Sequence, residues 1–234
     1  MDYTNPATFS NYQVVRPGQP EIIRQRLYDY LLYPTAGQAQ LTFFANPVGQ
    51  GVTSAPGAVV GSAKSLADTN MTAAGQLSKG VSYLAESIEV VFEPGTSAAA
   101  STFAVFNPSV FAAVSAAAVM DMIADVNVFR TSGWLELYIL SKTYLVEAPL
   151  GAFPSKTHLE LSAAVASNSA TTAEVAAATA YCAGRPYYLD PPITLDSNTN
   201  FNVFMKWPGA VATPSGFNAR VGVVFDGVQK RLSQ

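Results

Sequence analysis

The sequence predicts an all-β protein whose main domain is a jelly-roll β-sandwich or barrel. Strand-like segments recur along the chain, the clearest of them alternate apolar and polar residues with a period of two, and no segment repeats at a fixed spacing. A chain of 234 residues has room for one jelly roll with insertions, whereas two in tandem plus helices would be cramped. A single jelly roll is therefore favoured over a double one.

The longest strand-like segment is 133–154, with the sequence GWLELYILSKTYLVEAPLGAFP. Residues from Trp134 to Leu140 alternate between two faces, and both faces are largely apolar, which is typical of a strand covered on both sides. The pattern continues through Val146 and stops at Pro149. We expect the other strands to pair with this segment or to pack across from it.

The first 34 residues form a separate unit in this prediction. Residues 1–19 contain two prolines, have no periodicity and read as an extended arm. From Pro20 to Leu32 apolar residues recur at helical spacing, Pro20 suits a first helical turn, and Pro34 would end the helix. The predicted organisation is an N-terminal arm and amphipathic helix over 1–34, followed by the jelly-roll domain over 35–234.

Within 35–234 the alternating segments predict a series of strands. They cover 40–45, 83–92, 126–130, 157–165, 187–190, 193–195, 201–207 and 220–228. Asp226-Gly227, inside the last of them, is typical of a turn or a β-bulge.

Two short helices are predicted as insertions between these strands, near 108–124 and 171–183. Asn107-Pro108 gives the first a cap and a proline in its first turn. Thr171 with Glu174 three residues later fits a capping box for the second, and Gly184 fits its end. The Ala and Thr residues of the second segment are also compatible with an extended loop.

The chain carries few charges. Apolar residues make up 49% of it and charged residues 12%, about half of the usual charged share. Such a composition indicates a surface that is partly buried against other subunits, and its alternative is an ordinary secreted β protein of low charge. The net charge of −3 implies no general attraction to nucleic acid.

The sequence contains no recognisable catalytic motif. His158 is the one histidine and lacks a G-x-S-x-G partner, and Cys182 is the one cysteine, which excludes an intrachain disulfide and a cysteine-based zinc site. Acidic residues on strands, Glu89, Glu93 and Glu136, keep open a glycan-cleaving enzyme, which needs paired carboxylates. We expect no catalytic, cofactor or metal residues, and therefore no enzyme, no cofactor and no small-molecule substrate.

Three arginines near the N-terminus, Arg16, Arg24 and Arg26, are the candidate binding residues. On an inner surface they could contact phosphates of lipid or of a genome. Glu21 and Asp29 lie among them, so the alternative is local pairing on the surface of a helix.

Five stretches of this chain resemble capsid proteins of tailless icosahedral bacterial viruses. The stretches are DTNMTAAGQL, YLAESIEVVFEPG, SGWLELYILSKTYLVEAPLGAFP, PPITLDSNTNFNVFMKWP and ARVGVVFDGVQKR, about a third of the chain. The resemblance lies in the pattern of apolar and polar residues along the strand-like stretches, together with an N-terminal arm and Ala-rich insertions. Members of that family have one upright jelly roll or two in tandem, often around an internal lipid membrane.

The resemblance implies a major capsid protein that self-assembles into an icosahedral shell. Its partners would be other copies of itself, with minor capsid proteins, an internal membrane or the packaged genome as further contacts, and its location would be the virion after synthesis in the host cytoplasm. Two rivals stay open: a carbohydrate-binding jelly-roll module, spike or lectin-like, with Trp134, Tyr138 and Trp207 as its aromatic residues, and the glycan-cleaving enzyme above. A phage tail or tube protein is a further structural possibility.

Overall fold

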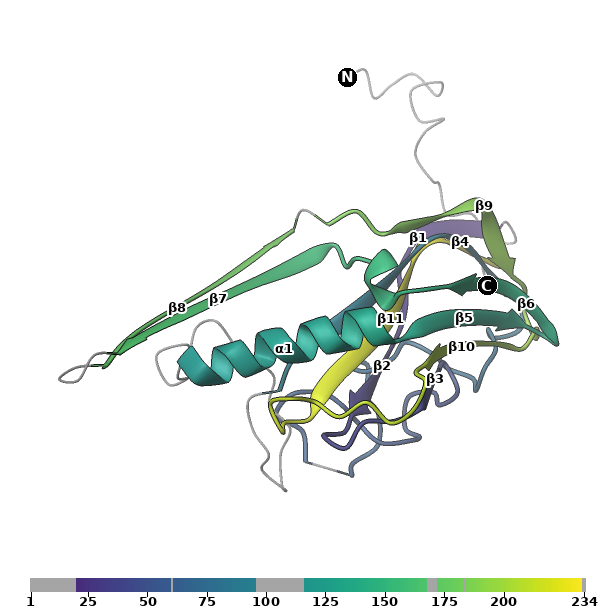
Figure 1. Ribbon diagram of the computed structural model, residues 1–234. Helices are drawn as coiled ribbons and strands as arrows, with labels where there is room; N and C mark the ends of the chain where they lie inside the picture. Colours follow the sequence, from purple (N-terminus) through teal and green to yellow (C-terminus); the bar gives the residue numbers. More distant parts are fainter. Residues whose placement is uncertain (1–19, 60, 96–115, 168–171, 183, 233–234) are drawn as a thin grey trace, which may run out of the picture.

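The computed structural model describes residues 20–59, 61–95, 116–167, 172–182 and 184–232. These residues fold mainly into strands, which form two antiparallel sheets and a separate two-stranded hairpin (Figure 1). One hydrophobic core contains buried residues from both sheets, so the two sheets make a β-sandwich. The prediction of an all-β fold is confirmed.

The larger sheet contains β1 (Pro20–Arg24), β2 (Leu27–Tyr33), β4 (Val81–Glu93), β9 (Tyr187–Leu195) and β11 (Ala219–Leu232). β11 pairs with β4 on one side and with β2 and then β1 on the other, and β4 pairs in turn with β9. The last strand of the chain therefore lies between the first strands and β4.

The smaller sheet contains β3 (Gln40–Phe43), β10 (Phe201–Lys206), β5 (Trp134–Ile139) and β6 (Lys142–Glu147), in that order across the sheet. β5 and β6 form a hairpin whose turn contains Leu140 at φ 55°. The segment 133–154 is therefore two strands, because the chain reverses at this left-handed residue.

The remaining elements are α1 (Ala116–Ser132), the short 3₁₀ turn η3 (Leu150–Ala152), β7 (Thr157–Ser167) and β8 (Thr172–Cys182). β7 and β8 pair over their whole length, and no shift interrupts the register. Figure 1 shows this hairpin extending away from the sandwich, with α1 beside it; α1 contacts it mainly through β7.

The core follows the period-two alternation of the strands. Every second residue of β5, of β10 and of β11 before its bulge points between the sheets. These side chains are buried: Leu135, Leu137, Ile139, Phe201, Val203, Met205, Ala219, Val221, Val223 and Phe225. Burial of each of the larger side chains among them stabilises the fold by about 1.5–3 kcal/mol. The alternation seen in the sequence is thus the pattern that assembles the sandwich.

An aromatic cluster attaches α1 to the sandwich. Phe129 stacks on Phe92 with 4.4 Å between ring centroids, and it lies 5.6 Å from Trp207 and 5.8 Å from Tyr33. These partners come from β4, from the end of β10 and from β2. The C-terminal half of α1 is therefore fixed to both sheets, and its direction fixes where the chain enters β5.

The helix predicted between Pro20 and Leu32 is wrong, since this segment forms β1 and β2. Both strands pair with β11, from Pro20 opposite Leu232 to Tyr33 opposite Ala219. The buried face of β2 includes a carboxylate, because Asp29 forms an ion pair of 2.5 Å with the equally buried Lys64. The charge of Asp29 interrupts the apolar alternation of β2, so the sequence pattern did not indicate a strand. Residues 1–19 of the predicted arm lie outside the described residues.

The helix predicted near 171–183 is also wrong, because residues 172–182 form β8. Pairing with β7 overrides the helix preference of its Ala residues. The helix predicted near 108–124 is confirmed for residues 116–124, and residues 108–115 lie outside the described part. This helix continues to Ser132, so the strand predicted at 126–130 is wrong.

A bulge interrupts the pairing of β11 with β4, as Asp226-Gly227 predicts. The register shifts between these two residues, and a Cβ atom on Gly227 would lie 2.0 Å from the carbonyl oxygen of Leu84. Gly227 is required because backbone occupies the space of a side chain.

We expect Gly227→Ala to lower the free energy of unfolding by about 1–3 kcal/mol, because the backbone of β4 or β11 must move to admit the methyl group. Gly209→Ala is the matched control, since a Cβ there meets nothing within 4 Å, and it should change stability by less than about 0.5 kcal/mol. Urea unfolding of both variants measures this. Equal midpoints would contradict the described packing at the bulge.

Candidate functional site

The base of the β7–β8 hairpin is the first candidate site, because it joins the projecting strands to the sandwich. The peptide N–H of Lys156 donates a hydrogen bond of 2.6 Å to Glu89, and its ammonium group contacts the carboxylate of Asp226. On the other side of the hairpin Gly184 donates to the carbonyl oxygen of Lys156 at 3.1 Å. A Cβ on Gly184 would lie 1.8 Å from the carbonyl oxygen of Ser155, so the two ends of the hairpin are in close contact.

Six charged residues from β1, the β1–β2 connection, β4, β11 and this base form what we call the root cluster. Its members are Arg24, Arg26, Glu86, Glu89, Lys156 and Asp226. Arg24 contacts Glu86 at 3.0 Å and Asp226 at 3.2 Å, and Arg26 lies 3.9 Å from Glu89. The three positive and three negative charges cancel, so the root cluster is a neutral ionic network.

Burial within the root cluster is uneven. The Glu89 side chain is 3% exposed and its Oε1 accepts no hydrogen bond from the described residues, whereas Arg26 is 51% exposed. Glu89 therefore depends on the Lys156 peptide and on the charge of Arg26. Burial lowers the pKa of Lys156, and the nearby charges of Arg26 and Arg24 lower it further, although Glu89 opposes them. The ammonium of Lys156 is held by its contact with Asp226.

The structure brings Arg24 and Arg26 together and gives both a carboxylate partner. Arg16 lies outside the described residues. Local pairing on a helix, the alternative for these arginines, is wrong, because Arg24 and Arg26 pair with carboxylates of β4 and β11 that are distant in sequence. Their proposed contact with lipid or genome phosphates stays a prediction, since both guanidinium groups remain more than half exposed.

The outer surface of the smaller sheet is the second candidate site, which we call the aromatic face. It consists of Trp134, Glu136, Tyr138, Phe204 and Lys206, which come from alternate positions of the paired strands β5 and β10. Tyr138 and Phe204 meet edge to face at 5.5 Å, and the Lys206 ammonium lies 5.4 Å from the Phe204 centroid. A flat face of this kind can bind another apolar surface or the face of a sugar ring.

Glu136 is the polar centre of the aromatic face. It accepts hydrogen bonds from the Trp134 indole at 2.7 Å and from Lys206 at 2.6 Å. Burial opposes its ionisation, but hydrogen bonds from Lys206, Trp134 and Tyr138, together with the charge of Lys206, outweigh this and lower its pKa. The carboxylate is therefore ionised and fully engaged, which leaves the rings as the contact surface.

Trp207 does not belong to the aromatic face, so its assignment to a sugar-binding surface is wrong. It continues the inward alternation of β10 and is 3% exposed, and its ring lies 5.2 Å from that of Tyr33. Its indole N–H makes no hydrogen bond to the described residues. Trp207 is a core residue.

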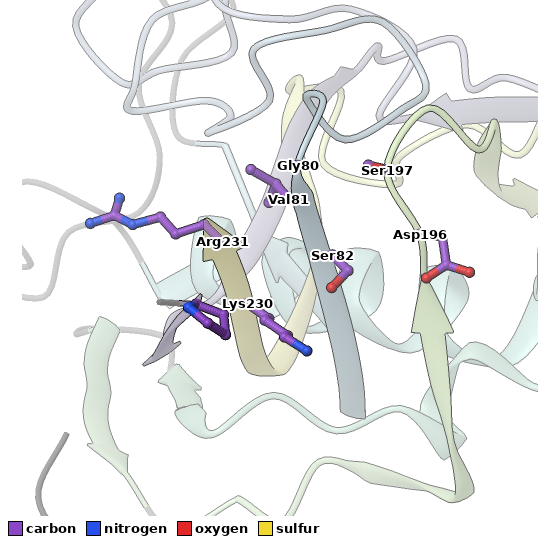
Figure 2. Close-up of a pocket in the computed structure, with 8 residues that line it drawn as sticks. Gly80, Val81, Ser82, Asp196, Ser197, Lys230 and Arg231 are labelled. Carbon is purple, nitrogen blue, oxygen red and sulfur yellow. The ribbon is translucent and has the colours of Figure 1, made fainter. Parts of the chain in front are cut away.

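An open pocket of about 260 Å³ lies beside the start of β1 (Figure 2). β4 contributes Val81 and Ser82, β11 contributes Lys230 and Arg231, and Asp196 and Ser197 follow β9. Arg231 is paired with Glu21 at 2.7 Å. The pocket therefore mixes acidic, basic and hydroxyl groups at an exposed rim, and its lining residues include no nucleophile and base in contact.

The carboxylates considered for glycan cleavage do not meet. Glu89 lies on the outer face of the larger sheet and Glu136 on the outer face of the smaller one, so the sandwich separates them. Among the described residues no group of three or more His, Cys, Asp or Glu side chains is placed to hold a metal ion. No helix in the described part of the chain is long and apolar enough to cross a membrane.

Comparison with known proteins identifies no relative of this chain. No protein-family model, no curated protein and no solved structure matches this chain.

We expect Lys156→Met to loosen the hairpin base, because the variant keeps the peptide N–H to Glu89 and removes the charge that pairs with Asp226. Amide hydrogen exchange in residues 157–182 should accelerate about fivefold, which corresponds to roughly 1 kcal/mol for a partly exposed ion pair. Lys142→Met, an exposed lysine of β6, serves as the control and should leave this exchange unchanged. Equal protection in both variants would refute the anchoring role.

Glu136 should make stability depend on pH in the acid range. Its pKa in the folded protein is below the value of 4.5 for the free side chain, so its stabilisation is present above that pH and is lost as the pH falls through the folded pKa. Glu136→Gln should flatten this loss, by roughly 1 kcal/mol between about pH 5 and pH 3. Urea unfolding at several pH values tests this, with Asn202→Ala as a neutral control on the same face. A parallel pH dependence in Glu136→Gln and the wild type would argue against it.

Proposed function

We propose that the sandwich is a single jelly roll. Without β1 and the β7–β8 hairpin, eight strands remain along the described chain: β2, β3, β4, β5, β6, β9, β10 and β11. The first pairs with the eighth, the second with the seventh, the third with the sixth and the fourth with the fifth. This is the pairing of one long antiparallel hairpin that has been rolled up, and the contacts β11–β4 and β10–β5 complete the two sheets. The strand order supports the proposal directly.

The function we propose is that of a self-assembling shell subunit, the major capsid protein of a tailless icosahedral virus. The observation that carries it is the β7–β8 hairpin, which leaves the sandwich with α1 beside it (Figure 1). A lone two-stranded hairpin is marginal in water and needs cover from other strands or helices. A second copy can supply that cover, so the hairpin is most simply understood as an assembly element.

The charge distribution supports the same function. Seven of the 13 Lys and Arg residues form ion pairs within the described chain: Arg24, Arg26, Lys64, Lys156, Lys206, Arg220 and Arg231. More than half of the basic side chains are therefore neutralised by a carboxylate partner, while Leu140, Val146 and Tyr188 are at least 60% exposed. A surface with few unpaired charges and several exposed large apolar side chains suits contact with other subunits. In a closed symmetric assembly each subunit makes several such contacts, so modest individual contacts together stabilise the whole.

A carbohydrate-binding module is the second candidate function, and the aromatic face favours it. Trp134, Tyr138 and Phe204 are half-buried on one face of the sheet, and Tyr138 and Phe204 are in ring contact. Asn202 and Lys206 on the same face can donate hydrogen bonds to hydroxyl groups. In this alternative the hairpin would have no assembly role.

Size measurement decides between the two functions. We expect the purified protein to form closed particles or uniform rings in negative-stain electron microscopy, with a matching radius in light scattering. A variant in which a short glycine-containing turn replaces residues 159–180 should keep the circular-dichroism signal of the sandwich and lose the particles. The shell function would be overturned by a wild-type protein that stays monomeric at all concentrations, both alone and mixed with the proteins that accompany it in the material it is isolated from. A glycan array would then test whether the aromatic face binds carbohydrate.

A further inference from the structure

Four of the five outer strands of the described sandwich, all except the five-residue β1, are protected against pairing with other strands. β9 carries Pro191 and Pro192, which have no N–H to donate, and β6 contains a bulge opposite Leu137 and Tyr138. β3 has four residues. These are the features by which natural sheets prevent edge-to-edge association.

The outer edge of β2 is protected in another way, by the chain itself. Segment 68–70 lies along it: the N–H of Tyr30 donates to the carbonyl of Asp68 at 2.8 Å, and the N–H of Tyr28 donates to the Asn70 side chain at 3.0 Å. Backbone groups that would attract another strand are therefore occupied. In the described structure, none of these four outer strands presents a long, regular, open edge.

The outer edge of β8 differs from all of these. β8 pairs with β7 through an unbroken register from Thr172 to Cys182, and within the described residues no strand pairs with its other edge. Among the described residues, α1 contacts the hairpin mainly through β7 and only slightly through β8. Neither strand contains Pro, Lys or Arg. This edge is long and regular, and Glu174 is its one charged residue.

We propose that β8 pairs antiparallel with β8 of a second copy, around a two-fold axis, so that two hairpins form one four-stranded sheet. The chemistry of the edge selects the occupant, because a row of peptide N–H and C=O groups is matched only by another extended backbone. This inference deepens the proposed shell function and rests on it, since it names the surface through which two subunits meet.

The single charged residue of β8 favours a symmetric antiparallel pairing of the two copies. We centre its register on Ala177, the midpoint of 172 and 182. In this register Glu174, its one charged residue, lies opposite Ala180 of the second copy. The two Glu174 residues are then six positions apart along the sheet, about 20 Å, where their repulsion is screened. A parallel in-register pair would place them side by side. Small residues, Ala176 to Ala178, occupy the centre and allow close approach.

Disulfide trapping tests this register. In a Cys182→Ser background, Ala177→Cys places two thiols directly opposite each other across the axis, within the Cα separation of about 4.5–5.5 Å that a disulfide accepts. We expect mild oxidation of the assembled protein to convert Ala177→Cys into a covalent dimer on a non-reducing gel. Ala164→Cys on β7 is the matched control and should stay monomeric, because two further strands separate it from its symmetry mate.

A mixing experiment checks the register independently. Ala176→Cys and Ala178→Cys, each in the same background, should give a covalent heterodimer when mixed and little dimer alone, since residue 176 of one copy faces residue 178 of the other. If the Ala177→Cys variant forms particles but no cross-link, the β8 pairing is overturned and the shell function stands. A wild-type protein that does not associate at all would overturn both.

Discussion

Backbone pairing of β11 is the interaction on which the rest of the sandwich depends. This strand donates and accepts along both edges, holding β1 and β2 on one side and β4 on the other, and its inner residues Val221, Val223 and Phe225 lie in the centre of the core. On its outer face Gly222 leaves room for the ring of Tyr30, and the Arg220 guanidinium lies 3.9 Å from the centroid of that ring. Because β11 is also the last strand, the larger sheet can close only when the C-terminal part of the chain is present. Contacts of such long sequence separation make folding slow compared with that of a helical protein.

Local alternation was sufficient to predict the strands of the core, and non-local partners explain where prediction failed. The inward residues of β5, β10 and β11 could be read from the sequence because apolar residues recur there with a period of two. The expectation that 134–140 is covered on both sides is wrong, since Trp134 and Tyr138 on the outer face of β5 are only half-buried in the described structure. β2 could not, since Asp29 interrupts its apolar face and is acceptable there only beside Lys64, from the long connection between β3 and β4. β8 could not, because its Ala residues favour a helix until β7 is in place. In both cases tertiary pairing overrides the local preference.

The residues of the candidate sites also fall into two groups, those that alternation alone could place and those that only strand pairing places. Trp134 and Tyr138 could be placed on one face from alternation alone, whereas Phe204 and Lys206 joined them only through the register of β10 with β5. The position of Trp207 was readable, because it has the same parity as the inward residues of β10, and that signal should have assigned it to the core. The root cluster was not readable. Its carboxylates come from β4 and β11, and nothing near Arg24 or Arg26 in the sequence indicates that a sheet would bring them together.

The placement of charge separates the two parts of this protein. Ionic contacts concentrate at the base of the hairpin, where Lys156, Asp226 and Glu89 join strands distant in sequence, and the hairpin strands themselves carry only Glu160 and Glu174 as acidic or basic residues besides His158. An anchored base fixes the direction of the hairpin before any partner arrives, so less conformational entropy is lost on association. A charge-poor strand edge then avoids the desolvation cost that buried ionic groups would impose on an interface. Fixed direction and low desolvation cost are the two physical requirements that the proposed pairing of subunits through β8 would place on the hairpin.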